Sequence, residues 1–358
     1  MWDSQTEEQF CAALLKECRF YREAFPHLHI KTLFIGGGTP SSLRISSLKR
    51  LLEGLFETFN LARQADPLQS RAPINETTIE MNPESVDPKK LQLLRSFGFN
   101  RVSLGIQSFH AHELRFLGRK HTQNKIHKAI TFLKESGFRN FNLDLIFGIP
   151  KSTLEDVRHS LESALSYSPT HISAYALTIE KGTLFYKRKI SPVATEMELA
   201  QYRFISAFLS QKGYRQYEVS AFSLPGYACQ HNLQYWKRWP YIGLGPSAAS
   251  FFQGRAYQQP SSLKEYIENP LPPLFREHPP KLLSPETELK EFLVANLRLL
   301  KGFSIREINR RFQMDFSHDF SDVLAKLYAL KWIRRSDKRL QLTRKGLYLL
   351  NDVLMEFM

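Results

Sequence analysis

The chain has 358 residues, 42% of them hydrophobic and 23% charged, which is typical of a globular protein with one large domain and one or two small ones. No apolar run approaches the roughly 18 residues that suggest a membrane span, and the charges in residues 1–19 predict that no signal peptide lies there. The net charge of +14 permits anionic partners, although no run of five lysines or arginines occurs.

The cysteine content points to a reducing compartment. The chain holds Cys11, Cys18 and Cys229, too few for a disulfide framework, so we expect a cytoplasmic protein. Cys11 and Cys18 fall seven residues apart in a predicted helix over 6–24, which places them on one helix face. We predict both as core residues and not as metal ligands.

Strands and helices alternate through the first half of the chain. The patterns predict strands over 30–35, at the end of 72–81, and over 101–106, 141–147 and 171–177, and helices over 6–24, 41–62, 87–97, 110–117, 123–136 and 153–167. This alternation favours a parallel sheet covered by helices, and therefore an α/β fold.

The pattern changes after residue 195. We predict a helix over 195–212 and a strand over 217–222, followed by a linker over 269–285 that carries six prolines. Residues 286–358 predict three helices, a β-wing over 332–342 that turns at Asp337-Lys338, and a last helix. This order is similar to a winged helix.

Polar residues and glycines stand where the predicted strands end. Gly36 follows Ile35, Glu80 follows Ile79, Gln107 follows Ile106, and Asp144 lies between two leucines. Three consecutive glycines at 36–38 allow the backbone to bend sharply and to approach a ligand closely. In a (β/α) barrel such strand ends converge on one mouth, where the active site lies.

Five motifs in this order resemble the HemN/HemW branch of the radical S-adenosylmethionine (SAM) superfamily. They are residues 35–41 (IGGGTPS), 79–83 (IEMNP), 103–109 (SLGIQSF), 117–121 (LGRKH) and 142–150 (NLDLIFGIP). The resemblance runs from about residue 8 to the C-terminus. It implies a partial (β/α)6 barrel lacking its first strand over 1–190, a HemN-type extension over 191–268, the linker over 269–285, and a winged-helix-like domain over 286–358.

The resemblance also implies a SAM site. Gly37, Gly38 and Thr39 would meet the amino-acid part of SAM, Glu80 would hydrogen-bond to SAM, Gln107 and Asp144 would bind ribose hydroxyls, and Arg119 would bind the SAM carboxylate through a bidentate guanidinium. Taken singly, Glu80 and Asp144 could instead form a polar layer in the barrel, and Arg119 a surface salt bridge.

A sixth motif favours the heme chaperones of this branch. Residues 231–236 (HNLQYW) match the H-N-x-x-Y-W motif of HemW-like proteins, which implies His231 as a heme-iron ligand and Tyr235 and Trp236 as stacking partners of the macrocycle. The alternative for His231 is a histidine that is hydrogen-bonded within a packed turn, with both aromatic residues in the core.

One family feature is missing. Radical SAM proteins hold a [4Fe–4S] cluster through C-x3-C-x2-C, and this chain has no such motif. We therefore expect no metal ligands here, and we expect a truncated product of a longer reading frame. A naturally cluster-free relative is the alternative.

These expectations combine into one function with two rivals. The main hypothesis is cytoplasmic heme binding and delivery to an acceptor protein that the sequence does not name, with a SAM site inherited from the family. One rival is oxygen-independent oxidative decarboxylation of coproporphyrinogen III. The other is a nucleic-acid-binding module that uses the basic residues near the wing, although we expect no nucleic-acid partner. We expect no transmembrane segment, and peripheral membrane contact stays open.

Overall fold

The computed structural model describes residues 3–62 and 74–358. Residues 72 and 73 of the predicted segment 72–81 therefore lie outside the described residues. None of the helices that the structure describes combines the length and the apolar character that crossing a bilayer requires.

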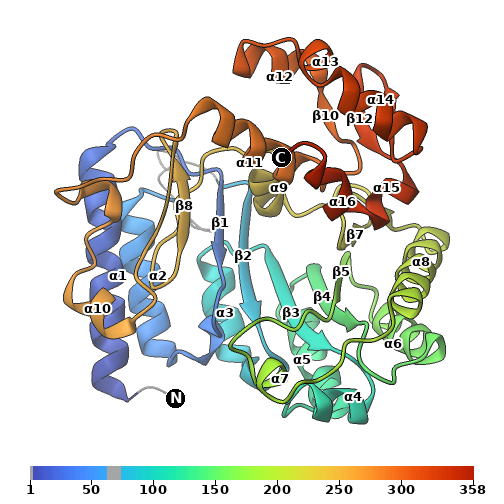
Figure 1. Ribbon diagram of the computed structural model, residues 1–358. Coiled ribbons are helices and arrows are strands. Elements are labelled where there is room, and N and C mark those ends of the chain that lie inside the picture. The colour runs from blue at the N-terminus through green and yellow to red at the C-terminus, as the bar shows by residue number, and fades with distance from the viewer. Residues whose placement is uncertain (1–2, 63–73) are drawn as a thin grey trace.

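A mostly parallel sheet forms the centre of the first half (Figure 1). Its parallel strands are β1 (Thr32–Ile35), β2 (Glu76–Met81), β3 (Arg101–Gln107), β4 (Asn140–Phe147) and β5 (His171–Ala176), which are neighbours in that order. The short strands β7 (Ala221–Ser223) and β6 (Arg215–Gln216) continue the sheet in antiparallel direction. The α/β class predicted from the sequence, with a parallel sheet covered by helices, is confirmed.

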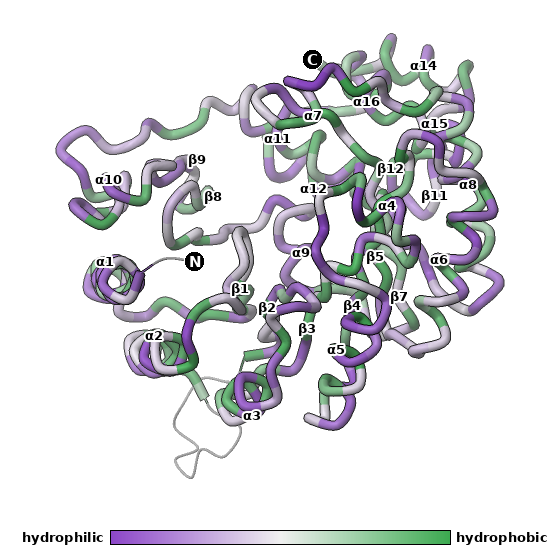
Figure 2. The backbone as a smooth tube through the Cα atoms, turned by 90° about the horizontal axis from the view of Figure 1, so that it is seen from below, coloured by the Kyte–Doolittle hydropathy of each residue, from purple (hydrophilic) through white to green (hydrophobic). Residues whose placement is uncertain are grey.

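Helices cover the outer side of this curved sheet (Figure 2). They are α1 (Ser4–Ala24), α2 (Ile45–Thr58), α3 (Pro88–Ser96), α4 (Ala111–Phe116), α5 (Gln123–Glu135), α6 (Leu154–Ser166) and α8 (Thr195–Gln211), and the short α7 (Leu184–Lys187) lies in the connection before α8. Their apolar faces form the core. Cys11 and Cys18 are both buried in it, as predicted.

Side chains along each strand alternate between the helix-covered side of the sheet and its inner side. In β3, Val102, Leu104 and Ile106 belong to the hydrophobic core, whereas Arg101, Ser103 and Gln107 line a cavity on the inner side. This is the two-residue alternation of a strand. The inner side of the sheet is therefore polar, and it is available to a ligand.

The predicted strand over 217–222 is wrong for its first four residues. Only Ala221 and Phe222 belong to β7, while the chain turns between β6 and β7. The Glu218 carboxylate accepts a hydrogen bond of 3.1 Å from the backbone N–H of Ser220. A side chain that bonds to the backbone two residues later favours a turn over an extended ladder.

The segment after β7 returns to the N-terminal helix. It contains α9 (Gln230–Trp236), the hairpin of β8 (Ala249–Phe252) and β9 (Arg255–Gln258), and α10 (Leu263–Glu268). The buried Glu17 carboxylate on α1 accepts hydrogen bonds from Gly245 N–H, Gln259 Nε2 and Tyr266 Oη at 2.6–2.8 Å. These bonds fasten the segment to α1.

The proline-rich residues 269–285 are held against the hairpin. Arg255 Nε donates to Pro280 O at 2.9 Å, and Leu283 N–H donates to Gly254 O at 2.9 Å. A 3-10 turn, Pro273–Phe275, interrupts the segment. These residues therefore run along the protein surface with fixed contacts, unlike a free linker.

The C-terminal part combines helices with a small antiparallel sheet. Its helices are α11 (Pro285–Asn296), α12 (Ile305–Phe312), α13 (Phe316–Asp319), α14 (Ser321–Ala329), α15 (Arg344–Tyr348) and α16 (Leu350–Met355), and its strands are β10 (Phe303–Ser304), β11 (Ile333–Ser336) and β12 (Arg339–Leu342). Asp337 and Lys338 connect β11 to β12 with φ of 49° and 62°, which matches a tight hairpin turn. The predicted wing and its turn are present.

Candidate functional site

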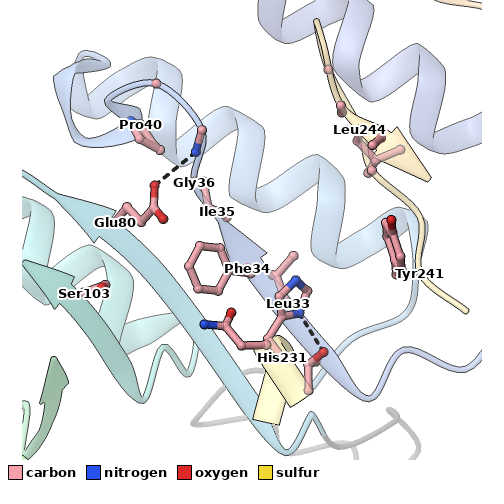
Figure 3. Close-up of a pocket in the computed structure, with 18 of the residues that line it drawn as sticks. Leu33, Phe34, Ile35, Gly36, Pro40, Glu80, Ser103, His231, Tyr241 and Leu244 are labelled. Carbon is pink, nitrogen blue, oxygen red and sulfur yellow. Dashed lines mark hydrogen bonds between the residues drawn. The ribbon is translucent and has the colours of Figure 1, made fainter. Parts of the chain in front are cut away.

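A cavity of about 1880 Å³ lies on the inner side of the sheet (Figure 3). It is lined by β1 and the glycine loop after it, by inner residues of β2 to β5, by α9, and by residues 239–249. Pockets for small ligands usually measure about 300–1,000 Å³. The cavity is therefore large enough for a macrocycle, or for two smaller ligands side by side.

The glycine loop is fixed against the end of β2. A Cβ at Gly36 would lie 2.8 Å from the Glu80 carboxyl group and 2.7 Å from the Phe34 ring, so any larger residue there would force one of these side chains to shift. Gly37 has φ of +99°, and its N–H donates to Glu80 Oε2 at 3.1 Å. Asn82 Nδ2 donates to Thr39 Oγ1 at 3.1 Å. The backbone groups of the loop are thus presented at the cavity wall.

Two carboxyl groups face the cavity from the inner side. Burial raises the pKa of Glu80, and the nearby Asp144 carboxyl raises it further. Burial also raises the pKa of Asp144, although Asn142 Nδ2 donates to it at 2.7 Å and Ser103 Oγ at 3.2 Å. Groups of this kind can act as hydrogen-bond acceptors for ligand hydroxyl or ammonium groups.

The structure brings most of the predicted SAM residues to one cavity. Six of the seven line it, namely Gly37, Gly38, Thr39, Glu80, Gln107 and Asp144. Gln107 has φ of +67° at a shift of register between β3 and β4, and such bulges re-aim side chains next to functional sites.

Arg119 is the exception. It is not among the described residues that line the cavity, and the prediction that it lies around the same cavity is wrong in this structure. Arg119 follows α4 and Gly118, whose φ is +68°, and its backbone N–H returns to Leu114 O at 2.8 Å. This tight turn keeps Arg119 at the end of α4.

His231 lies at the cavity wall in α9. Its Nδ1 is 2.8 Å from Thr32 Oγ1, its Nε2 is 2.8 Å from Tyr235 Oη, and its ring stacks on Phe34 with centroids 5.1 Å apart. Burial lowers the pKa of His231 to about 4. The imidazole is therefore neutral at physiological pH, which is the form that ligates metals.

The two aromatic residues of the motif have different positions. Tyr235 lines the cavity and meets Tyr241 edge to face, with centroids 4.5 Å apart. Trp236 is not among the described lining residues. Instead it packs under the Arg298 guanidinium, whose Cζ lies 4.8 Å from the Trp236 ring centroid and covers one face of the ring. The structure therefore does not place Trp236 at the cavity wall with Tyr235, and its stacking role stays a prediction.

Two residues that sequence reasoning missed are central to the site. Glu76 accepts hydrogen bonds from the backbone N–H groups of Gln230 and His231 at 2.9 and 3.0 Å, and so holds the start of α9. Arg101 lines the cavity although only 2% of its surface is exposed. The sequence offered a clue to Arg101, because this charged residue falls on the same face of the strand as Ser103 and Gln107, while the residues between them are mostly apolar. No comparable signal marked Glu76.

The cysteines do not fit a [4Fe–4S] cluster. Cys11 and Cys18 are buried in the core on α1, and burial raises the pKa of Cys11 to about 11 and that of Cys18 further. Cys229 Sγ donates to Glu76 Oε1 at 3.3 Å, and burial raises its pKa to about 12. Cluster ligands are thiolates that surround one cube, and these three thiols belong to separate, dry environments.

Comparison with known protein families finds two matching regions. Residues 15–164 match the radical SAM superfamily, and residues 283–349 match the HemN C-terminal domain. The coproporphyrinogen III oxidase HemN from Escherichia coli, described as a radical SAM enzyme, superposes with a TM-score of 0.80 over 100% of this chain and 85% of that chain. At 23% identity this likeness shows a shared fold.

Sequence relatives are more specific. The heme chaperone HemW of Bacillus subtilis is 31% identical over 92% of this chain and 86% of its own length. That of Lactococcus lactis is 29% identical over 94% and 86%, and that of Escherichia coli is 40% identical over 61% and 55%. With the two matched domains, these relatives show that the chain belongs to the HemW family of the radical SAM superfamily.

Proposed function

We propose that this protein binds heme in the cavity beside α9 and delivers it to an acceptor protein. The observation that carries the proposal is His231, a neutral imidazole at the wall of a cavity of about 1880 Å³, in the H-N-x-x-Y-W motif. The HemW relatives are named heme chaperones, which supports the same function. The acceptor is unidentified, and the proposed compartment is the cytoplasm, in keeping with three free cysteines.

Heme ligation would require His231 to exchange one hydrogen bond. In the tautomer with the proton on Nδ1, Thr32 Oγ1 accepts that proton and Tyr235 Oη donates to Nε2. Heme iron would compete with the Tyr235 hydroxyl for Nε2, while Thr32 keeps the ring oriented. When heme leaves, Tyr235 returns to Nε2, so the buried nitrogen is never without a partner. This exchange would moderate heme affinity and help release.

We also propose a SAM site at the glycine loop. Gly37, Gly38 and Thr39 would offer backbone groups and a hydroxyl to the amino-acid part of SAM, and Glu80 would accept a hydrogen bond from it. Gln107 and Asp144 remain the predicted ribose contacts. Arg119 remains the predicted contact of the SAM carboxylate, although it does not line the cavity in this structure. The cluster is not part of the proposal for this chain, because its cysteines do not fit one.

Heme titration tests the proposed function. The wild type should develop a ligated heme absorption band in the Soret region, and His231→Ala should weaken binding or shift that band. His318→Ala is the matched control, because its side chain is 85% exposed and lies in the C-terminal part. Heme loaded on the wild type should then move to apomyoglobin. Equal spectra and equal affinities for wild type and His231→Ala would remove His231 from the proposal.

A further inference from the structure

The feature that points beyond heme ligation is the side chain of Arg101, the first residue of β3. It is among the largest fully buried side chains, at 2% exposure, and it lines the cavity. Within residues 3–62 and 74–358, no ion pair and no hydrogen bond joins its side chain to another residue. Its Nε is a buried donor without a partner.

A buried cation without a partner is costly. Removing a charge from water costs several kcal/mol unless an opposite charge and hydrogen bonds compensate. Glu80 and Asp144 interact electrostatically with Arg101, but among the described residues neither forms an ion pair with its guanidinium, and burial raises the pKa of both. The arginine is therefore prepared for an anion that the protein itself does not supply.

The other titratable groups around Arg101 are one carboxyl group, Glu76, and several neutral side chains. Arg101 contributes to the lowered pKa values of His171 and His231, although burial is the larger cause in both. Tyr217 and Cys229 are kept neutral because burial raises their pKa values. The Glu76 carboxyl group raises the pKa of His231 and so opposes Arg101 there, but its oxygens already accept the N–H groups of Gln230 and His231. An anion entering this end of the cavity would meet the Arg101 guanidinium and the uncharged imidazole of His231.

The sheet register sets Arg101 beside the proposed heme position. Phe34 pairs with Thr78, and Thr78 pairs with Arg101, so these three residues lie at one level of the sheet. Phe34 carries the stacked ring of His231. Glu80 points to the same side of β2 as Thr78 but comes two residues later, so Glu80 and the glycine loop lie about 7 Å further along the strand direction. Arg101 is therefore level with His231 and below the proposed SAM amino-acid site.

We propose that Arg101 is the anion-binding residue of this cavity and that it takes a carboxylate in bidentate fashion. A guanidinium fork matches the geometry of a carboxylate. The carboxylate has two sources in the proposed function, on which this inference rests: a propionate group of heme, or the carboxylate of SAM. The level of Arg101 in the sheet favours the propionate, because His231 lies at that level.

Paired ligands with and without the carboxylate test the proposal. Heme and heme dimethyl ester are titrated into the wild type, Arg101→Met and Arg101→Lys, and SAM and decarboxylated SAM form the second arm. The wild type should prefer the carboxylate form by about 10- to 100-fold, as expected for hydrogen bonds to a charged group. Arg101→Met should lose the preference, and Arg101→Lys should keep only part of it. Arg139→Met, which removes an exposed arginine, should keep it in full.

The two arms identify the source. Loss of preference for heme over its ester supports the propionate, and loss confined to the SAM pair assigns the SAM carboxylate. If Arg101→Met retains both preferences, the proposal is overturned. If neither form of heme binds to the wild type, the proposed heme function fails, and the SAM pair still decides the role of Arg101.

Unfolding without ligand separates this role from a structural one. A buried arginine without a bound anion destabilises the ligand-free protein, so Arg101→Met should unfold at the same or a higher temperature than the wild type. The increase in melting temperature that ligand produces in the wild type should be absent in this variant. If Arg101→Met does not fold and Arg101→Lys keeps its full ligand preferences, Arg101 has a structural role and the anion site is refuted.

Discussion

The Glu76 carboxylate accepts a hydrogen bond of 3.0 Å from the backbone N–H of His231, 155 residues further along the chain. Glu76 is the first residue of β2 and is 5% exposed. By also binding Gln230 N–H and Cys229 Sγ, it satisfies donors at the start of α9 that have no partner within the helix. The position of the His231 imidazole therefore depends on a strand residue that never touches the ring.

Replacing Glu76 should disturb the site through α9. Glu76→Ala leaves two partly buried N–H groups without their acceptor, at a cost of up to about 1–3 kcal/mol for each group that water does not reach. We expect a lower melting temperature and weaker heme binding, and Glu76→Gln, which keeps an acceptor oxygen, should lose less. Thermal unfolding and heme titration measure both effects. Glu268→Ala, at a side chain that is 64% exposed, is the control. Unchanged heme affinity in Glu76→Ala would separate α9 from the heme site.

Gly36 and Gly38 offer a matched pair of substitutions in the glycine loop. A Cβ at Gly36 meets the Glu80 carboxyl and the Phe34 ring at 2.7–2.8 Å, whereas a Cβ at Gly38 meets nothing within 4 Å. We expect Gly36→Ala to lower the free energy of unfolding by about 1–3 kcal/mol, as overpacking does, and Gly38→Ala to leave it nearly unchanged. Urea denaturation of the ligand-free protein measures this. Equal stability of the two variants would mean that the loop moves freely from Glu80.

Local patterns were sufficient to predict the barrel strands and the glycine loop. Apolar runs that end at Gly36, Glu80 and Gln107 fix strand ends, and parallel strands place their ends along one edge. The same logic predicted that Asp144 would face the others, because its neighbours Leu143 and Leu145 pack on the opposite side. These predictions depended only on residues within a few positions of each other.

Contacts between distant segments could not be predicted from such local patterns. The tie between Glu76 and His231 joins a strand to a helix of another region. Trp236 was predicted at the site because of its motif, but Arg298 of the C-terminal part covers its ring. Arg119 stands next to a matching motif, yet the turn at Gly118 determines where it lies. In the first two cases a contact between distant segments decided the position, and such a contact has no signature in the surrounding sequence.

The buried Glu218 should make stability depend on pH. Burial raises its pKa from 4.5 to about 7, and Glu218 forms a bridge to Leu299 where the barrel meets the C-terminal part. A carboxyl group with a raised folded-state pKa stabilises fully below the unfolded value, and this contribution is lost as the pH rises through the folded value. Stability from Glu218 should therefore decline between about pH 4.5 and 7, by at most roughly 3 kcal/mol.

Glu218→Gln isolates this effect. The amide keeps an acceptor for Ser220 N–H but does not ionise, so the variant should exceed the wild type in stability at pH 8 and match it near pH 4.5. Urea denaturation at both pH values gives the difference in the free energy of unfolding between the variant and the wild type. The contributions of the other carboxyl groups cancel in this difference. If the variant is less stable than the wild type at pH 8, Glu218 is a paired carboxylate, with Arg298 as its partner.

The hydroxyl of Tyr235 should limit how tightly heme binds. It lies 2.8 Å from His231 Nε2, the nitrogen that the iron would need, while Thr32 Oγ1 lies 2.8 Å from Nδ1. Tyr235→Phe removes the competitor, so heme affinity should rise by roughly 2- to 10-fold, the value of one net hydrogen bond, and transfer to apomyoglobin should slow. Thr32→Val removes the partner that orients the ring, so affinity should fall. Tyr186→Phe, at a residue that is 49% exposed, is the control. If Tyr235→Phe binds heme less tightly and Thr32→Val binds it normally, the iron does not use Nε2 of His231, and the exchange between hydroxyl and iron has to be abandoned.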